Sequence, residues 1–384
     1  MPALADHFSR DIAIVDGDGC YVTDRDGRRY IDFVAGWCVG TVGWKHHAVV
    51  TALKRQAEHG LFVPALFRYP AWEQFAKQLV DLAPGSRLQR AWRCTSGSEA
   101  IEFAIKCARA ATGKKTIVSI DGVYHGHTYG AASVGDAMTP DMAPGVPGFM
   151  KLPLPNQYHG VDTGDVISRF EHLLRASHDV AAFLSEPVFT NAGVILPPSD
   201  FYPEIQRLCR QHGVLVMMDE VATGFGRCGA LFASSLWGLE PDVLCLGKGM
   251  TGGYGTMGAT LVSEEIFQRS KHIPQLSTFG WAAQDMAAAQ AVIDVILRER
   301  LWENAHGLGM YLIDQLRALE SRPYVGQVRN AGLLLGMEIV KDKSSKKPDP
   351  ERAEKLAEDC ARSGLLIETA GNVLFMSPPI HDVA

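Results

Sequence analysis

Two short apolar runs, each followed closely by a polar side chain, limit the folds open to this chain more than any other feature. Val214 to Met218 is followed by Asp219. Val243 to Leu246 is followed by a glycine and then Lys248. Apolar runs this short, between helix-like and glycine-rich segments, are typical of buried parallel strands. Because ligands bind beyond the carboxyl ends of such strands, the sequence predicts that Asp219 and Lys248 lie at the same edge of one sheet.

This pair of side chains has a specific chemical use. A lysine amine forms a Schiff base with an aldehyde, above all with that of pyridoxal 5'-phosphate (PLP). The ring nitrogen of PLP needs a neighbouring anion to stay protonated, and an aspartate at a strand end can supply it. Taken without their neighbours, a helix cap at Asp219 and a solvated surface lysine at Lys248 are the simpler interpretation.

The residues around the pair favour the cofactor-binding interpretation instead. The segments DEVATGFGR, which begins at Asp219, and PDVLCLGKGMTGG, which contains Lys248, resemble the signature of class III (subgroup II, ω-type) PLP-dependent aminotransferases. The resemblance covers about residues 10 to 380. It implies that Lys248 is the Schiff-base lysine, that Asp219 pairs with the pyridinium nitrogen, and that Val221 packs on one face of the ring.

The same resemblance implies the PLP-dependent transferase fold type I, an α/β fold. It predicts a large domain with a doubly wound, mostly parallel sheet at 45–275, and a smaller α+β domain built from 1–44 and 276–384. The alternation of helical and strand-like segments along the chain agrees with right-handed crossovers in a parallel sheet. The expected helices include 47–59, 71–82, 98–112, 165–176 and 201–212, the expected strands include 116–120 and 180–185, and a loop is expected at 133–164.

Composition and charge argue against several other classes of protein. The net charge of −6 argues against a nucleic-acid surface. No apolar run approaches the roughly 20 residues that a membrane-spanning helix needs. The first residues do not contain a basic segment followed by an apolar core, so no secretory signal is expected. Eight cysteines without a C-x-x-C pair predict reduced thiols in a cytoplasmic enzyme, with neither a disulfide framework nor a zinc site.

A candidate phosphate site precedes the helix expected at 98–112. Ser96, Gly97 and Ser98 stand at its start, where free backbone N–H groups and the helix dipole attract an anion. A simple N-cap is the alternative. The resemblance implies that these three residues bind the phosphate of PLP.

Two more residues enter the expected cofactor site. Tyr124 begins the sequence Tyr124-His125-Gly126-His127, which could suggest a metal site, but no third ligand has suitable spacing. The resemblance implies instead that Tyr124 stacks on the cofactor ring opposite Val221. Glu186, at the end of the strand expected at 180–185, joins the cofactor-binding residues. No metal is expected.

The resemblance also implies a homodimer. Ser277-Thr278-Phe279-Gly280 is similar to a family segment whose threonine reaches the cofactor phosphate of the neighbouring active site, which requires a second copy. A threonine at a helix start is the alternative for Thr278. The family commonly continues with G-N-P, whereas this chain has Trp281 after Gly280, so the shape of this loop is not carried over from the family.

Departures from the family concern the substrate. Many members bind the α-carboxylate of glutamate with an arginine that a glutamate neutralises at other times. Asn191 stands in the place of that glutamate, and Phe375 or Met376 in the place of the arginine. Because neither Phe nor Met can replace a bidentate arginine contact, we expect that glutamate and 2-oxoglutarate are not recognised through that pair.

Two further positions bear on the pocket. Ala222 stands where ornithine- and GABA-type members have glutamine. In this respect the segment resembles diaminopelargonate and amine:pyruvate aminotransferases instead. Trp37 is a candidate pocket wall, and a core tryptophan at a domain junction is equally consistent with its surroundings. The resemblance further implies a helix after Ser377-Pro378-Pro379 that this sequence does not contain.

The expected reaction is ping-pong transamination from an amine or ω-amino donor to a carbonyl acceptor, with Lys248 as the group that moves the proton. The alternatives are an aminomutase similar to glutamate-1-semialdehyde aminomutase, a racemase, or a decarboxylase of the same fold. A non-catalytic PLP-binding homologue is a further alternative. The expected partners are small-molecule amines and keto or aldehyde compounds, with no nucleic acid and no membrane.

Overall fold

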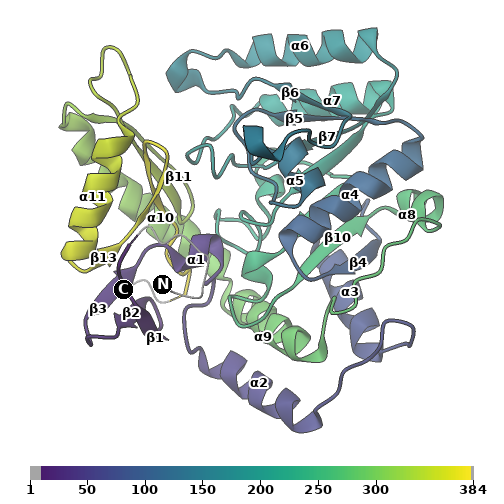
Figure 1. The fold of residues 1–384 in the computed structure, drawn as a ribbon, viewed down its shortest axis with the longest axis horizontal. Helices are drawn as coiled ribbons and strands as arrows, with labels where there is room; N and C mark the ends of the chain where they lie inside the picture. The colour runs from purple at the N-terminus through teal and green to yellow at the C-terminus, as the bar shows by residue number, and fades with distance from the viewer. Residues whose placement is uncertain (1–9, 382–384) are drawn as a thin grey trace.

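A computed structural model describes residues 10–381 (Figure 1). Residues 1–9, which carry most of the segment considered for a secretory signal, lie outside this range, as do 382–384. Within it, no helix is long and apolar enough to cross a membrane.

A central seven-stranded sheet carries the ends of the two apolar runs. Its strand order is β4-β10-β9-β8-β7-β5-β6, and β10 alone runs antiparallel to its neighbours. The doubly wound, mostly parallel sheet expected from the resemblance is confirmed. The strands are β4 (Arg90–Cys94), β5 (Thr116–Ile120), β6 (Phe149–Leu152), β7 (Val180–Ser185), β8 (Leu215–Asp219), β9 (Val243–Leu246) and β10 (Gly258–Val262).

Helices cover both faces of this sheet. Successive residues of β8 point to opposite faces, so that Met217 packs in one apolar cluster and Met218 in another. The first cluster contains residues of α4 and α8, and the second contains residues of α6 and α7. Burial on both faces explains why the strand sequences are continuously apolar. The helices around the sheet are α2 (His47–His59), α3 (Pro70–Leu82), α4 (Gly97–Thr112), α5 (Tyr129–Val134), α6 (Thr163–Ala176), α7 (Phe201–His212), α8 (Glu264–Ser270) and α9 (Ala283–Glu299).

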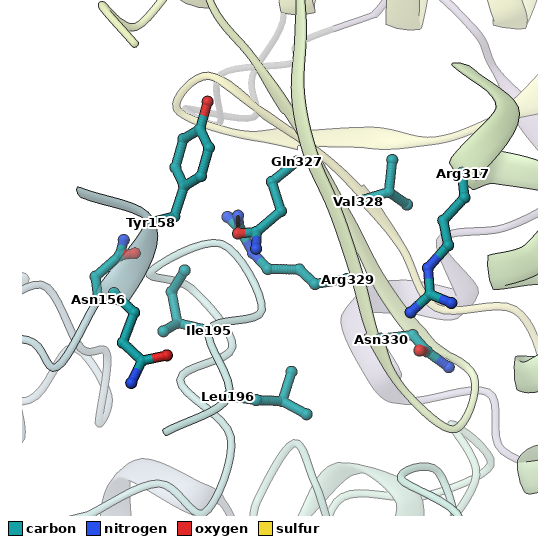
Figure 2. Close-up of a pocket in the computed structure, with 10 residues that line it drawn as sticks. Asn156, Tyr158, Ile195, Leu196, Arg317, Gln327, Val328, Arg329 and Asn330 are labelled. Atoms are coloured by element: carbon teal, nitrogen blue, oxygen red, sulfur yellow. Dashed lines mark hydrogen bonds between the residues drawn. The ribbon is translucent and has the colours of Figure 1, made fainter. Parts of the chain in front are cut away.

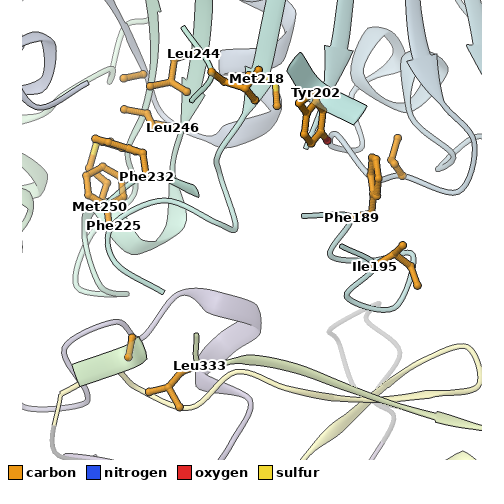
Figure 3. Close-up of a cluster of buried hydrophobic side chains, with 14 of the residues drawn as sticks. Phe189, Ile195, Tyr202, Met218, Phe225, Phe232, Leu244, Leu246, Met250 and Leu333 are labelled. Carbon is orange, nitrogen blue, oxygen red and sulfur yellow. The ribbon is translucent and has the colours of Figure 1, made fainter. Parts of the chain in front are cut away.

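The apolar core continues past the sheet toward the C-terminal part of the chain. Figure 3 shows Leu244 and Leu246 on β9, Met218 on β8, Phe225 and Phe232 on the loop that follows β8, and Leu333 on the opposite side of the view. All of these side chains are buried. Burying a large apolar side chain contributes about 1.5–3 kcal/mol, so this cluster fixes the loop that follows β8.

Two four-stranded sheets lie beside the central one. The first has the order β1-β2-β3-β13, so a strand near the C-terminus completes a sheet of N-terminal strands. The second has the order β11-β12-β15-β14. Figure 1 shows the N-terminal strands beside β13 and α11, although the division at 44/45 and 275/276 stays a prediction. The elements are β1 (Ile14–Asp18), β2 (Tyr21–Asp24), β3 (Arg29–Asp32), α10 (Leu301–Arg317), β11 (Val325–Ala331), β12 (Leu334–Ile339), α11 (Pro350–Arg362), β13 (Leu365–Leu366), β14 (Glu368–Ala370) and β15 (Val373–Met376).

The prediction of a loop at 133–164 is wrong in one respect. Its residues 149–152 form β6, the edge strand of the central sheet, which pairs with β5 in parallel. An edge strand pairs on one side only, so the segment needs no strong apolar pattern and gives a weak sequence signal. Short 3-10 helices stand at Pro140–Met142, Gln157–His159, Ala233–Trp237, Lys248–Met250 and Ala318–Ser321.

Candidate active site

Asp219 and Lys248 line one cavity of about 170 Å³. β8 and β9 are parallel neighbours in which Asp219 pairs with Cys245, and the backbone N–H of Glu220 donates to the Cys245 carbonyl at 2.9 Å. This register brings the residues after both strands to the same edge, as expected. Lys248 follows β9 with a left-handed φ of 38°, an uncommon conformation for a lysine that is typical of functional sites. The other lining residues are Ser96, Gly97, Ser98, Tyr124, His125, Gly126, His127, Glu186, Thr190, Asn191, Val221 and Ala222.

The carboxylate of Asp219 is held on both oxygens. Oδ1 accepts the backbone N–H of Val221 at 3.0 Å, and Oδ2 lies 2.8 Å from Nδ1 of His125. Asp219 and His125 are each less than 5% exposed. A buried carboxylate with both oxygens engaged has a fixed orientation, so Asp219 presents a defined anionic edge to the cavity.

Glu186 lies in the same cavity and is fully buried. Burial is the main cause that raises the pKa of Glu186 to about 7, His125 opposes the shift, and the charge of Asp219 adds to it. Its Oε2 accepts the backbone N–H of Thr190 at 3.2 Å, while Oε1 has no partner among the described residues. A buried polar atom of this kind facing a cavity is a place where a ligand can bind.

Ser96, Gly97 and Ser98 form a cradle at the start of α4. Ser96 is the N-cap, and its Oγ accepts the backbone N–H of Glu99 at 3.2 Å. A Cβ on Gly97 would lie 2.7 and 2.9 Å from the two methyl groups of Val221. The absence of that Cβ therefore lets the helix start approach Val221 while its backbone N–H groups stay open to an anion.

The Tyr124–His127 segment closes another side of the cavity. The Oγ of Ser98 accepts the backbone N–H of His127 at 3.3 Å, which ties this segment to the start of α4. Burial, followed by the charge of Asp219, raises the pKa of Tyr124, so its ring is a neutral phenol at physiological pH. Tyr124 and Val221 thus line one cavity from different loops.

Thr278 does not line this cavity. Its side chain is exposed, and it follows Ser277, whose Oγ donates to a carboxylate oxygen of Glu99 at 3.1 Å. The same oxygen accepts the backbone N–H of Thr95 at 2.6 Å. Thr278 is therefore fixed near the N-terminal end of α4 but faces outward from the single chain.

Trp37 and Phe375 contact each other outside the lining of the cavity. Their rings stack with centroids 4.6 Å apart and an angle of 23°. Phe375 is fully buried, in an apolar cluster against which Trp37 and Ala222 also pack. Ala222 lines the cavity, so the apolar cluster that contains the stack reaches one of its walls.

The segment that carries Trp37 is strained. α1 (Ala35–Cys38) has positive φ at all four residues, including 58° at Trp37, which costs about 1–2 kcal/mol for each non-glycine residue. Asp32 anchors the turn, since its Oδ1 accepts the backbone N–H groups of Val34 and Ala35 at 2.9 Å each.

A second cavity, of about 280 Å³, lies between β11 and the segments at 156–158 and 195–196 (Figure 2). It contains Arg329, which contacts the loop after Glu186 at the carbonyl of Gly193. Arg329 is already paired, because its Nη1 lies 2.7 Å from Glu338 and its Nε donates to the carbonyl of Gly193 at 2.8 Å. No Schiff-base lysine or strand-end aspartate lines this cavity, so it does not have the chemistry of the first.

Four residues of the first cavity have no site role predicted from the sequence: His125, Gly126, His127 and Thr190. The sequence offers His125 and His127 only as metal ligands. The contact of His125 with Asp219 joins residues 94 positions apart, which no local pattern can indicate. The only available signal was their place beside Tyr124 and Glu186.

The residues of the cavity fit PLP. An amine lies at Lys248, a fixed carboxylate at Asp219, and an anion cradle at Ser96–Ser98, which match the aldehyde, the ring nitrogen and the phosphate of this cofactor. The central sheet and this site together define a PLP-dependent transferase of fold type I.

Comparison with known proteins gives the family. The family model described as aminotransferase class-III matches residues 4–381. An acetylornithine aminotransferase of Methanothermobacter thermautotrophicus is 36% identical over 96% of this chain and 89% of its own length. An alanine/serine racemase of Pyrococcus horikoshii is 32% identical over 95% of this chain and 81% of its own length. An amine transaminase from an uncultivated Pseudomonas species, solved with PLP bound, has a TM-score of 0.93 at 32% identity, covering 99% of this chain and 93% of that one.

The chain belongs to the class III aminotransferase family. It is a PLP-dependent enzyme that transfers amino groups between small-molecule amines and carbonyl compounds, as the resemblance implied.

Proposed function

We propose that this aminotransferase takes its amino group from an amine or ω-amino donor and does not bind 2-oxoglutarate through a glutamate–arginine pair. The observation that carries the proposal is the burial of Phe375 against Trp37, in the place where other family members have arginine. Asn191, in the place of the glutamate, lines the cavity and carries no charge. A carboxylate at this wall would lose water without gaining an arginine in return.

Arg329 does not replace the missing arginine in this proposal. Its guanidinium is engaged by Glu338 and by the Gly193 carbonyl. Breaking a buried ion pair by drawing one partner away costs about 3–5 kcal/mol. An acceptor with one carboxylate or none therefore suits the cavity better than a dicarboxylate.

The roles of the residues follow from the site. When bound, PLP supplies an electrophilic aldehyde and an electron-accepting ring. We propose that Lys248 would hold the aldehyde of the cofactor through its Nζ and would act as the proton-transfer group at the amine-bearing carbon of the substrate. Asp219, oriented by His125, would hold the ring nitrogen in its protonated form. Ser96, Gly97 and Ser98 bind the phosphate, and Tyr124 and Val221 enclose the ring.

Acceptor specificity tests the proposal. The enzyme, loaded with its amino group by a donor amine, is mixed with pyruvate, an aldehyde or 2-oxoglutarate, and the return of the visible cofactor absorbance is followed. We expect kcat/KM for pyruvate to exceed that for 2-oxoglutarate by at least tenfold. The opposite preference would contradict the proposal.

A second candidate reaction is racemisation. The alanine/serine racemase of Pyrococcus horikoshii is similar to this chain over most of its length. A racemase and an aminotransferase can share Lys248 and Asp219, because both remove a proton from the carbon that bears the amine. Chiral analysis of alanine incubated with the enzyme and no added keto acid separates the two. Interconversion faster than amino transfer would favour the racemase.

We also propose a homodimer in which Thr278 of one subunit reaches the phosphate of the neighbouring active site. Thr278 is exposed in the single chain, and apolar side chains around it are exposed as well. Phe62 and Phe279 have ring centroids 5.7 Å apart, so two such segments lie side by side. An exposed apolar patch is typical of an interface. The exposed side chains are Leu61, Phe62, Leu66, Phe67, Leu276 and Phe279.

Light scattering coupled to gel filtration tests the dimer, with Leu66→Glu as the variant, because Leu66 is 89% exposed in the single chain. Dissociation of the variant with loss of cofactor affinity is expected. A monomeric wild-type enzyme with full activity would refute this arrangement. A cytoplasmic location is part of the same proposal, and the eight free cysteines support it.

A further inference from the structure

We propose that His46, Glu299 and His381 form a binding site for a divalent transition-metal ion such as Zn²⁺, apart from the cavity of Lys248. Their ligand atoms all lie within 4.8 Å of one another. None of the three lines the cavity of Lys248. They are far apart in the sequence, so no motif with metal-ligand spacing could show them.

The donor set has the chemistry of such a site. Two imidazoles and one carboxylate are the protein ligands of many catalytic zinc sites, with a water at the fourth position. Nε2 of His381 lies 2.9 Å from Oε2 of Glu299. The ring of His46 stands edge-on to that of His381, with centroids 5.0 Å apart and an angle of 89°.

The spacing is close to that of a formed site. Zinc bonds of about 2.0–2.1 Å in tetrahedral geometry place ligand atoms about 3.4 Å apart. The ligand atoms here all lie within 4.8 Å of one another, so rotation of the side chains about their χ angles would bring them toward that spacing.

The backbone at each ligand is anchored. The N–H of His46 donates to the hydroxyl of Tyr254 at 2.6 Å, at the start of α2. Glu299 is the last residue of α9. His381 follows Ile380, whose N–H donates to the carbonyl of Thr41 at 2.9 Å and whose carbonyl accepts from the side chain of Asn304 at 2.8 Å.

The carboxylate has a partner of the kind that metal ligands use. Oε1 of Glu299 lies 2.6 Å from Nη2 of Arg298, which leaves Oε2 for the ion. Hydrogen bonds of this sort orient ligating carboxylates. The side chains of Glu299 and His381 are about one-third and one-fifth exposed, so an ion can enter from solvent.

An ion at this place would join three separate elements. Hydrogen bonds join the segment before His381 to the segment before His46. The N–H of Ser377 donates to the Phe33 carbonyl at 2.7 Å, and its Oγ donates to the Val34 carbonyl at 2.7 Å. The turn that holds Trp37 lies within the latter segment. Metal binding would therefore stabilise the strained turn behind the active site.

Metal titration of the holoenzyme tests the site. The protein is treated with a chelator, freed of excess cofactor, and titrated with Co²⁺, which is read by its visible d–d bands, and Zn²⁺ is then added as the competitor. The variants are His381→Ala and Glu299→Gln. The matched control is His178→Ala, which removes an exposed histidine elsewhere on the surface.

We expect one ion per chain in the wild type and in His178→Ala, a higher Tm when the ion is bound, and at least tenfold weaker binding in both site variants. Circular dichroism and the cofactor absorbance verify that the variants are folded. Unchanged affinity in both site variants, or no saturable binding in the wild type, would overturn the proposal. A change in the cofactor absorbance that persists with equal affinity in both site variants would assign the ion to the cavity of Lys248 and overturn it as well.

Discussion

Nδ1 of His125 lies 2.8 Å from Oδ2 of Asp219, and both side chains are almost fully buried. With Val221 on the other oxygen, Asp219 cannot rotate without breaking a buried hydrogen bond. The carboxylate of Asp219 is therefore held at one fixed place in the cavity. This pair is the least local of the contacts around Asp219, because it joins residues 94 positions apart in the chain.

Replacing His125 by Ala should lower kcat about 10–100-fold, the range for loss of a partner that orients a functional ligand. His125→Asn is the matched control, because its amide nitrogen can occupy the place of Nδ1 and still donate to Asp219. We expect Asn to recover most of kcat. Steady-state kinetics and the pH dependence of the cofactor absorbance measure the effect. An equal loss of kcat in both variants would show that packing of the His125 ring, and not its hydrogen bond to Asp219, supports turnover.

Lys248→Ala should abolish turnover and remove the visible absorbance of the lysine-bound cofactor. Lys248 is the only lysine that lines the cavity among the described residues, so no other amine can take its place. Absorbance spectra and a donor-amine assay measure this. Lys271→Ala, at an exposed position after α8, is the control and should keep full activity. Turnover by the Lys248 variant would reject the assigned role.

Gly97→Ala should weaken cofactor binding about tenfold or more. The new Cβ would lie 2.7 Å from a methyl group of Val221, and overpacking of this kind costs about 1–3 kcal/mol. Gly307→Ala is the control, because a Cβ there meets no atom within 4 Å and the residue lies inside α10. That variant should gain about 0.5–1 kcal/mol of stability and bind the cofactor normally. Fluorescence titration with PLP compares the two.

Phe375→Ala should reduce the free energy of unfolding by about 3–5 kcal/mol, because the ring is fully buried and stacks on Trp37. Tyr311→Ala, which removes a ring that is 62% exposed, should cost less than about 1 kcal/mol. Urea denaturation followed by tryptophan fluorescence measures both. Similar losses in the two variants would mean that the stack contributes little to stability.

Glu186 should make the cofactor-free protein less stable as the pH rises. Burial raises its pKa from 4.5 to about 7, so the folded chain holds this proton more tightly than the unfolded chain. The stabilisation from protonated Glu186 is fully present below pH 4.5, decreases as the pH rises toward 7, and is lost at higher pH. It amounts to about 3 kcal/mol.

The comparison of wild type with Glu186→Gln isolates this effect. Gln keeps the size of the side chain but does not titrate, so the difference in unfolding free energy between the two proteins should change between about pH 5 and about pH 8. Chemical denaturation at both pH values measures it. Parallel pH profiles would show that Glu186 does not titrate in this window.

The sequence by itself determined the family and the residues at the strand ends. The apolar runs before Asp219 and Lys248 predicted two buried parallel strands of one sheet, and the structure has β8 and β9 there, which also pair with each other. The helix at 98–112 was expected from its N-terminal signal and is α4, which starts at Gly97. These features are local, because strand and helix periods and capping residues act within a few positions.

The tertiary structure alone decided which distant residues meet. The contact of His125 with Asp219, the stack of Trp37 on Phe375, and the approach of His46 to His381 each join segments that are far apart in the chain. The raised pKa of Glu186 likewise depends on burial, which only the folded chain creates. A sequence pattern records the neighbours of a residue along the chain, whereas charge, stacking and ligand geometry depend on its neighbours in space.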